Sequence, residues 1–143
     1  MDGVVELEIP ARPEYVGIAR MAVGALAGIR PGLPYERIDD LRIVVSEACT
    51  SAIEVLGMEG CLRLRCVDSP KVLEIRIEAP GAAFESVFPD DDEAGPEVDS
   101  FRISLIRALV DDAELRSAGG TTELCLVVHR DGASDEDDGD LPA

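Results

Sequence analysis

Apolar residues recur at every second position in five short stretches of the chain, which is the pattern of half-buried β-strands. In the first stretch, Val5, Leu7 and Ile9 alternate with glutamates. The other four stretches form two pairs, one around the turn at residues 68–71 and one around residues 119–120, so they predict two hairpins. The predicted strands are residues 4–9, 62–66, 73–78, 113–117 and 121–129.

A second pattern, in which apolar residues follow a 3.6-residue repeat, predicts three helices. The first starts at Pro13 and ends at residues 30–32, and the second starts at Pro34 and ends before Gly57. The third spans residues 100–111. On the polar side of the first hairpin, arginines that face glutamates favour antiparallel pairing. The order of elements predicts an α+β fold, a two-layer sandwich with three helices on one face of a mostly antiparallel sheet.

The chain has 143 residues, enough for one domain, and its net charge of −17 is unevenly distributed. Seven acidic residues and no basic one lie in residues 85–99, and six acidic residues and no basic one follow residue 130. We predict one domain at residues 1–130, with an acidic lid loop at 80–99, and an acidic disordered tail at 131–143. The acidic balance makes nucleic acid and anionic membranes poor partners.

The sequence predicts neither a membrane span nor a secretory signal, because no apolar run is long enough and the N-terminus is acidic. The four cysteines have no CxxC spacing and lie in apolar periodic segments. We therefore expect reduced core thiols in a cytoplasmic protein, and neither a disulfide framework nor a metal site. These cysteines are Cys49, Cys61, Cys66 and Cys125.

The most informative segment is LRIVVSEACTSAI, residues 41–53, in the second predicted helix. Glu47 and Ser51 are one helical turn apart and share a face that flanks the apolar stripe. Both side chains are therefore placed to lie at the edge of a cleft. From the spacing alone, a solvated glutamate beside a small serine is the favoured interpretation of the pair.

In this segment the chain resembles the anti-sigma-factor serine kinases, small members of the histidine-kinase/Hsp90-like (GHKL) ATPase superfamily. VVSEACTSAI is similar to the family's N-box, and LEIPARPEYVGIAR is similar to its first strand and helix. LIRALVDDAEL and GGTTELCL are similar to its last helix, last strand and GTT turn. The resemblance covers about residues 5–130, and it implies the same order of elements as the periodicity.

The resemblance implies roles at a nucleotide site and also marks altered positions. It implies that Glu47 is the general base, and Ser51 stands where the family has an asparagine that holds Mg²⁺. In the adenine-binding motif Gly81 is retained, whereas Ala79 replaces the aspartate that accepts a hydrogen bond from adenine and Ala83 replaces the second glycine.

The phosphate-side motifs are altered in part. Ser100 and Arg102 fall in the family's glycine-rich motif, where Arg102 is the residue able to grip a phosphate itself, and Thr121 and Thr122 are retained. We therefore expect a degenerate site for ATP and Mg²⁺, with Ser51 as the candidate metal ligand and with nucleotide affinity weakened or lost.

For function, the resemblance implies an anti-sigma factor that sequesters a sigma factor and is countered by a STAS-type anti-anti-sigma partner. Arg20 stands where the family has an arginine that contacts both partners, and the first helix and strand imply a homodimer. One alternative is an active ATP-dependent serine kinase that phosphorylates its antagonist, with Glu47 taking the serine proton. Another is a binding module of the same fold with a different partner.

Overall fold

Five antiparallel strands form one sheet in the order β1-β2-β3-β5-β4. The computed structural model describes residues 2–57, 59–81 and 100–131 of the chain. Both predicted hairpins are present, β2 with β3 and β4 with β5, and β1 pairs with β2 at one edge. The strands are β1 (Gly3–Pro10), β2 (Cys61–Asp68), β3 (Val72–Pro80), β4 (Asp112–Ala118) and β5 (Thr121–His129).

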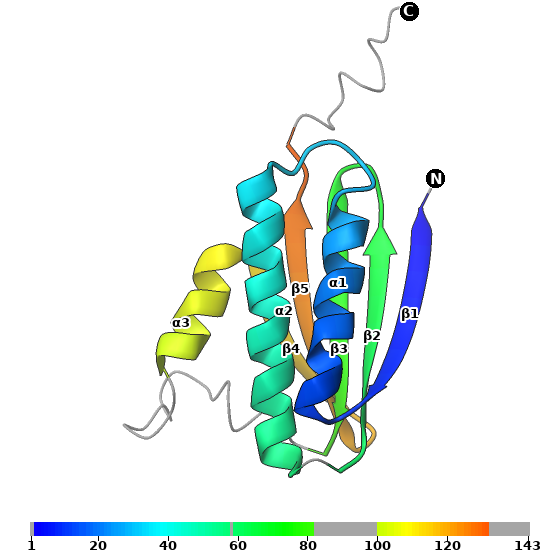
Figure 1. Cartoon of the computed structure of the whole chain (residues 1–143), viewed down its shortest axis with the longest axis vertical. Helices are drawn as coiled ribbons and strands as arrows, with labels where there is room; N and C mark the ends of the chain where they lie inside the picture. Colours follow the sequence, from blue (N-terminus) through cyan, green and yellow to red (C-terminus); the bar gives the residue numbers. More distant parts are fainter. Residues whose placement is uncertain (1, 58, 82–99, 132–143) are drawn as a thin grey trace, which may run out of the picture.

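The helices lie together on one side of this sheet (Figure 1). They are α1 (Val16–Ala27), α2 (Tyr35–Leu56) and α3 (Ser100–Leu109), and a 3₁₀ turn, η1 (Pro13–Tyr15), leads into α1. Helices α1 and α2 cover the sheet, and α3 packs against the other flank of α2. The predicted α+β two-layer architecture is therefore confirmed, with element ends that differ from the prediction by a few residues.

The core fills the space between the two layers. Every second side chain of β2, β3 and β5 is buried under the helices, as the period-two pattern predicts. Helix α2 contributes the largest share of the helical core, because its buried positions recur every three or four residues. Among the fully buried side chains are Leu41, Val44, Leu62, Leu64, Leu73, Ile75, Ile77, Ile106, Leu124 and Leu126.

The other face of the sheet is open and charged, and its pairing differs in one place from the prediction. Arg63 lies opposite Glu78, as expected, but Arg65 lies opposite Arg76. The register places both arginines in one cross-strand row, although like charges directly opposite each other are unfavourable. Each finds its carboxylate elsewhere: Arg65 pairs with Glu6 on β1, and Arg76 pairs with Glu74 on its own strand.

The C-terminal end of α1 is fixed by a buried guanidinium. Arg130 donates to the carbonyl oxygens of Ala27 at 3.1 Å and of Arg30 at 3.2 Å. It also forms an ion pair of 2.6 Å with the buried carboxylate of Asp68, which in turn pairs with Arg30 at 3.0 Å. Arg130 therefore joins the end of β5 to the end of α1 and the end of β2.

The chain next to this clamp passes close to the α1–α2 connection. Gly32 has a φ of +115°, and a Cβ there would lie only 2.7 Å from the Cβ of Arg130, so the position requires glycine. The N–H of Asp131 donates to the Gly32 carbonyl at 2.8 Å. The last described residues of the chain are thus held at the end of the molecule where α1 stops.

No helix in the described part of the chain has the length and apolar character needed to cross a membrane. Most of the predicted lid, residues 82–99, and all of the predicted tail after Asp131 lie outside the described residues.

Candidate functional site

Glu47 and Ser51 lie on the same flank of α2, as their spacing predicts, but their environments differ. Ser51 is only 1% exposed, whereas Glu47 is half-buried. The Ser51 hydroxyl donates to the backbone carbonyl of Glu47 at 2.8 Å. This local bond turns the hydroxyl hydrogen toward the helix backbone, which is a common arrangement for serine inside a helix.

Three further candidates meet where β3 ends and β5 begins. The backbone N–H of Gly81 donates to the Gly120 carbonyl at 2.7 Å. In the β3–β5 ladder Thr122 lies opposite Ala79, and Thr121 lies opposite Pro80. The structure thus brings Gly81, Thr121 and Thr122 together at one end of the sheet. Arg102 lies in the first turn of α3, and its side chain is outside the described part of the structure.

Polar groups are scarce at the position that the resemblance assigns to adenine recognition. Ala79 is fully buried on the helix side of the sheet, and its neighbour across the ladder, Thr122, is 1% exposed. A buried alanine offers only a methyl group where the family has a carboxylate. No described group of three or more His, Cys, Asp or Glu side chains is arranged to hold a metal ion.

Three of the four cysteines lie in the core, and one prediction about them is wrong. Burial raises the pKa of Cys49 to about 12 and that of Cys66 and Cys125 to about 11, so all three are neutral thiols near pH 7. Cys61 is exposed rather than buried. Its place at the start of β2 puts it on the open face beside Glu8, whose hydrogen bond raises the pKa of the thiol.

Arg20 lies in a groove between α1 and α2, on the side away from the sheet. The groove, called here the α1–α2 groove, has a volume of about 460 Å³. Arg20 donates from Nη1 to the Ser46 hydroxyl at 2.8 Å. Arg42 donates to the carboxylate of Asp39 at 3.1 Å. The residues that line the groove are Arg20, Asp39, Arg42, Ile43, Ser46 and Glu47.

Close packing of the two helices shapes this groove. A Cβ built on Gly24 of α1 would lie 2.4 Å from Nε of Arg42, so glycine is needed for Arg42 to lie across α1. Ile43, which lines the groove, is 45% exposed, and Met21, which follows Arg20 on α1, is 72% exposed. Sequence reasoning singled out Arg20 and Glu47 but missed Ser46 and Arg42. The recurrence of polar residues at 39, 42 and 46 on one helix flank was the available signal.

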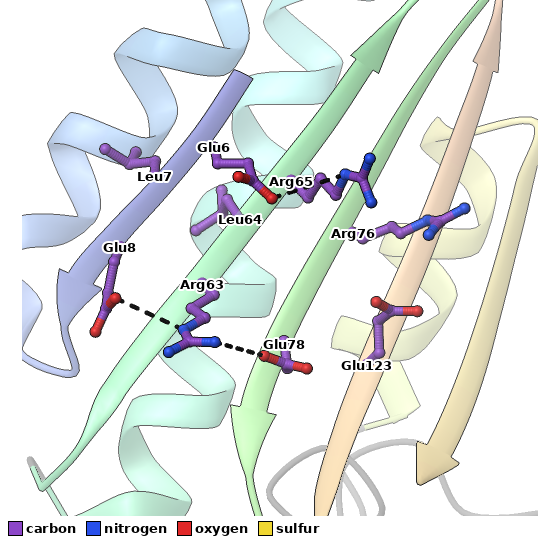
Figure 2. Close-up of a pocket in the computed structure, with 9 residues that line it drawn as sticks. All are labelled: Glu6, Leu7, Glu8, Arg63, Leu64, Arg65, Arg76, Glu78 and Glu123. Atoms are coloured by element: carbon purple, nitrogen blue, oxygen red, sulfur yellow. Dashed lines mark ion pairs between the residues drawn. The ribbon is translucent and has the colours of Figure 1, made fainter. Parts of the chain in front are cut away.

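A second hollow, of about 470 Å³, lies on the open face of the sheet. Figure 2 shows its charged side chains, which come from neighbouring strands and point away from the helices. Arg63 lies between two carboxylates, at 3.6 Å from Glu8 and 3.9 Å from Glu78, and Arg65 lies 3.8 Å from Glu6. None of the residues that the sequence analysis assigned a role lines this hollow.

Comparison with known proteins gives concordant results. The family model of the histidine kinase-like ATPase domain matches residues 9–128. The chain is 33% identical over 134 residues to the serine-protein kinase RsbW of Bacillus pumilus, which spans 83% of this chain and 82% of that protein. It is 31% identical over 131 residues to RsbW of Bacillus subtilis, spanning 82% and 81%. It is also 31% identical over 127 residues to RsbW of Listeria monocytogenes serotype 4a, spanning 80% of each.

A solved structure supports the same fold. The crystal structure of the RsbU and RsbW domains of a Mycobacterium tuberculosis protein superposes with a TM-score of 0.63 at 16% sequence identity. The superposition covers 90% of this chain and 33% of that larger chain. At this identity the likeness establishes the architecture and nothing further.

Proposed function

Because the chain belongs to the histidine kinase-like ATPase domain family, and within it to the RsbW serine-protein kinases, we propose that it is an anti-sigma factor. It binds and sequesters a sigma factor, and a STAS-type anti-anti-sigma protein counters it by competing for the same surface. We assign the folded domain to residues 1–130 and the site of partner contact to the α1–α2 groove.

The observation that carries this proposal is the state of Arg20. Its guanidinium is exposed on α1, and no carboxylate of the described residues lies within ion-pair distance of it. Exposed Ile43 also lines the groove, and exposed Met21 follows Arg20 on α1, so a guanidinium without an ion pair lies beside apolar contact area. Arginine beside apolar side chains is a favoured centre of protein interfaces.

The direct test is binding of the purified chain to each sigma factor and each STAS-type protein of its source organism. We expect one member of each class to bind, and Arg20→Ala to weaken both complexes about tenfold or more. Arg12→Ala, on an exposed arginine before η1, is the matched control and should leave both affinities unchanged. If no sigma factor in the set binds, the proposal fails, and a binding module with another partner becomes the better interpretation.

We further infer that this chain has weakened or lost ATP binding. The described residues do not fit a Mg²⁺-bound nucleotide well, because Ala79 offers no acceptor to the base and the short Ser51 side chain is only 1% exposed. Loss of a buried acceptor that fixes the base costs about 1–3 kcal/mol of binding free energy. A chain that acts only by binding its protein partners needs neither of the two family residues that Ala79 and Ser51 replace.

Calorimetric titration with Mg-ATP, with ADP as the control, tests this inference. We expect no heat and no thermal stabilisation at millimolar nucleotide, because a ligand that occupies a folded site stabilises it. An Ala79→Asp, Ser51→Asn double variant restores both family residues and should gain affinity. Micromolar binding by the unaltered chain would overturn the inference.

The alternative is an active serine kinase, favoured by the retained Glu47 on a half-buried helix flank and by relatives that carry the name serine-protein kinase. Under this alternative Glu47 takes the proton of the antagonist's serine. Glu47→Ala then abolishes phosphate transfer to the STAS-type protein and leaves partner binding intact. Under the binding-only proposal, neither the chain nor the variant transfers phosphate.

We also propose that the chain acts in the cytoplasm as a homodimer, joined through β1 and α1. β1 is an edge strand, and Val4 is 52% and Val5 40% exposed there, while Ile18 is 48% exposed on α1. Exposed apolar side chains on an unpaired edge favour association of two copies. A double substitution, Val5→Lys with Ile18→Lys, should give a monomer in sedimentation velocity. A wild-type monomer at micromolar concentration would overturn the dimer.

A further inference from the structure

The two arginines of the α1–α2 groove are held by chemically different groups. Arg42 donates to the Asp39 carboxylate at 3.1 Å, so its positive charge is compensated within the groove. Arg20 donates to the Ser46 hydroxyl at 2.8 Å, and a hydroxyl carries no charge. Within the described residues, Arg20 has no acidic partner. Of the two guanidinium groups in the groove, only that of Arg42 is ion-paired with a carboxylate of the described residues, and Glu47 also lines the groove.

Holding a guanidinium with a hydroxyl has two consequences. The hydrogen bond restricts a long side chain that otherwise loses about 0.5–1.5 kcal/mol of conformational freedom when a partner immobilises it. It also leaves the remaining N–H donors and the full charge available to an incoming carboxylate. A carboxylate at position 46 would restrict the side chain equally well but would cancel its charge.

The surroundings leave the guanidinium accessible from the outer side of the helices. Gly17 has no side chain, and a Cβ placed there would lie 3.5 Å from Nη2 of Arg20. The guanidinium therefore lies next to a helix position that has no side chain to cover it. Ser46 itself lies on the flank of α2 that faces α1, and Glu47, the next residue, lies about 100° further around the helix. Ser46 therefore accepts the hydrogen bond from α1, and Glu47 lines the same groove without forming an ion pair with Arg20.

We propose that Ser46 is a positioning residue for partner recognition, which presents the guanidinium of Arg20 to a carboxylate on the partner without neutralising it. The partner segment that fits carries one Asp or Glu flanked by apolar side chains that cover Met21 and Ile43. This inference rests on the proposed function, because it assigns Arg20 to partner contact. It extends that function by naming the residue that sets the position and the charge of the contact.

Three substitutions in the full chain separate positioning from structural support. Ser46→Ala removes the acceptor, Ser46→Asp retains an acceptor but compensates the charge, and Ser46→Thr keeps the hydroxyl. Against the partner found in the binding set, we expect Ser46→Ala to be about fivefold weaker. Ser46→Asp should be at least about tenfold weaker, and Ser46→Thr should stay within about twofold of the wild type. Arg63→Gln, on the open face of the sheet and outside the groove, is the matched control and should also stay within about twofold.

The salt dependence of association supplies a readout that a purely structural role does not change. Ser46→Asp should flatten the dependence of the association rate on salt, because the uncompensated charge is gone, whereas Ser46→Ala should retain it. Equal affinity and equal salt dependence for Ser46→Asp and the wild type would overturn the proposal. If Ser46→Asp fails to fold in thermal denaturation, the contrast between Ser46→Ala and Ser46→Thr decides.

A measurement without a partner keeps this test independent of the proposed function. In ¹⁵N NMR spectra of the free protein, the guanidinium of Arg20 should rotate slowly in the wild type and in Ser46→Thr, and freely in Ser46→Ala. Identical guanidinium signals in wild type and Ser46→Ala would refute positioning by Ser46. If no sigma factor or STAS-type protein binds, the proposed function fails, and the NMR comparison still decides whether Ser46 holds Arg20.

Discussion

The open face of the sheet and the α1–α2 groove are both charged, but they differ in whether each arginine is paired with a carboxylate. On the open face every described arginine lies within 4.0 Å of a carboxylate, in pairs that are mostly exposed. In the groove, Arg20 is held by a hydroxyl. The number of charges is therefore a poor guide to a binding surface, and the uncompensated charge is a better one. The open-face arginines are Arg63, Arg65, Arg76 and Arg116.

The difference follows from how each surface is built. Neighbouring strands place polar side chains of one parity side by side, so glutamates and arginines on β1, β2 and β3 meet without any specific packing. The groove lies between two packed helices, where Gly24 leaves room for the Arg42 side chain to lie across α1. On a strand face, the register places opposite charges beside each other. Two packed helices can instead hold one guanidinium with a hydroxyl and without an ion pair.

The largest expected effect concerns the clamp at the C-terminal end of α1, where Arg130 contacts the carbonyls of Ala27 and Arg30. Arg130→Ala leaves the Asp68 carboxylate with Arg30 alone and removes the donors to the last carbonyls of α1. Removing one partner of a buried ion pair costs about 3–5 kcal/mol, and we expect the lower end because Arg30 remains. Urea denaturation at neutral pH measures this loss.

The clamp also sharpens the comparison between the two surfaces. Because Arg130 contacts α1 and not the open-face side chains, the variant should weaken partner binding through the groove as well as stability. A double variant with Asp68→Ala should lose less than the sum of the single losses, since the two residues act as a pair. Fully additive losses would show that Arg130 and Asp68 do not act together.

A smaller effect is expected at Asp111, which ties α2, β5 and the segment after α3 together. Its carboxylate accepts the backbone N–H of His129 at 2.6 Å and pairs with Arg37 at 3.1 Å. Partial burial raises the pKa of Asp111, but these two hydrogen bonds outweigh it and hold the pKa below its usual range. Asp111→Asn should therefore cost about 1 kcal/mol near pH 7, a value reduced by solvent screening.

The pH dependence follows from the direction of this shift. A carboxylate whose pKa is lowered in the folded state stabilises the protein above its unfolded pKa, near 4, and loses that contribution as the pH falls through its folded pKa. The difference in urea midpoint between wild type and Asp111→Asn should be constant from about pH 5 to 7 and shrink below about pH 4. A difference that persists at acid pH would refute a role for the charged carboxylate.

Next in size is a change that creates a second free charge in the groove. Asp39→Asn should release Arg42 and strengthen binding of an acidic partner about threefold, with a steeper salt dependence. Glu6→Gln makes the matched change on the open face, where it releases Arg65. It should leave partner affinity unchanged. Equal effects of the two variants would show that net charge, and not the groove, controls association.

The sequence predicted the elements of this fold well, because each rests on local periodicity. The alternation in residues 73–78 and the stripe through Leu41, Val44 and Ala48 specify a buried face without knowledge of the partner element. Element order then restricted the architecture to helices on one face of an antiparallel sheet. The family resemblance was correct for the same reason, since its motifs lie at the ends of these elements.

The candidate site was less predictable, because its contacts join residues far apart in sequence. Arg20 meets Ser46 across 26 positions, and Arg130 meets Asp68 across 62, and neither pair leaves a periodic signal. The register that sets Arg65 opposite Arg76 depends on how the turn at residues 68–71 closes. The motifs singled out Glu47 and Arg20 as candidates, but only the packing of α1 on α2 shows that Ser46 holds Arg20.

The smallest expected effect is on the open face itself, and it tests whether that surface is inert. Arg63 is 67% exposed and pairs with Glu8 and Glu78 only at 3.6 and 3.9 Å. Arg63→Gln should change the free energy of unfolding by less than about 0.5 kcal/mol, because exposed ion pairs of this kind are screened by water and salt. It should also leave partner affinity and its salt dependence unchanged, in contrast to substitutions at Arg20 and Ser46. A loss of binding comparable to that of Arg20→Ala would mean that a compensated charge network can recognise a partner, and the distinction between the two surfaces would then be wrong.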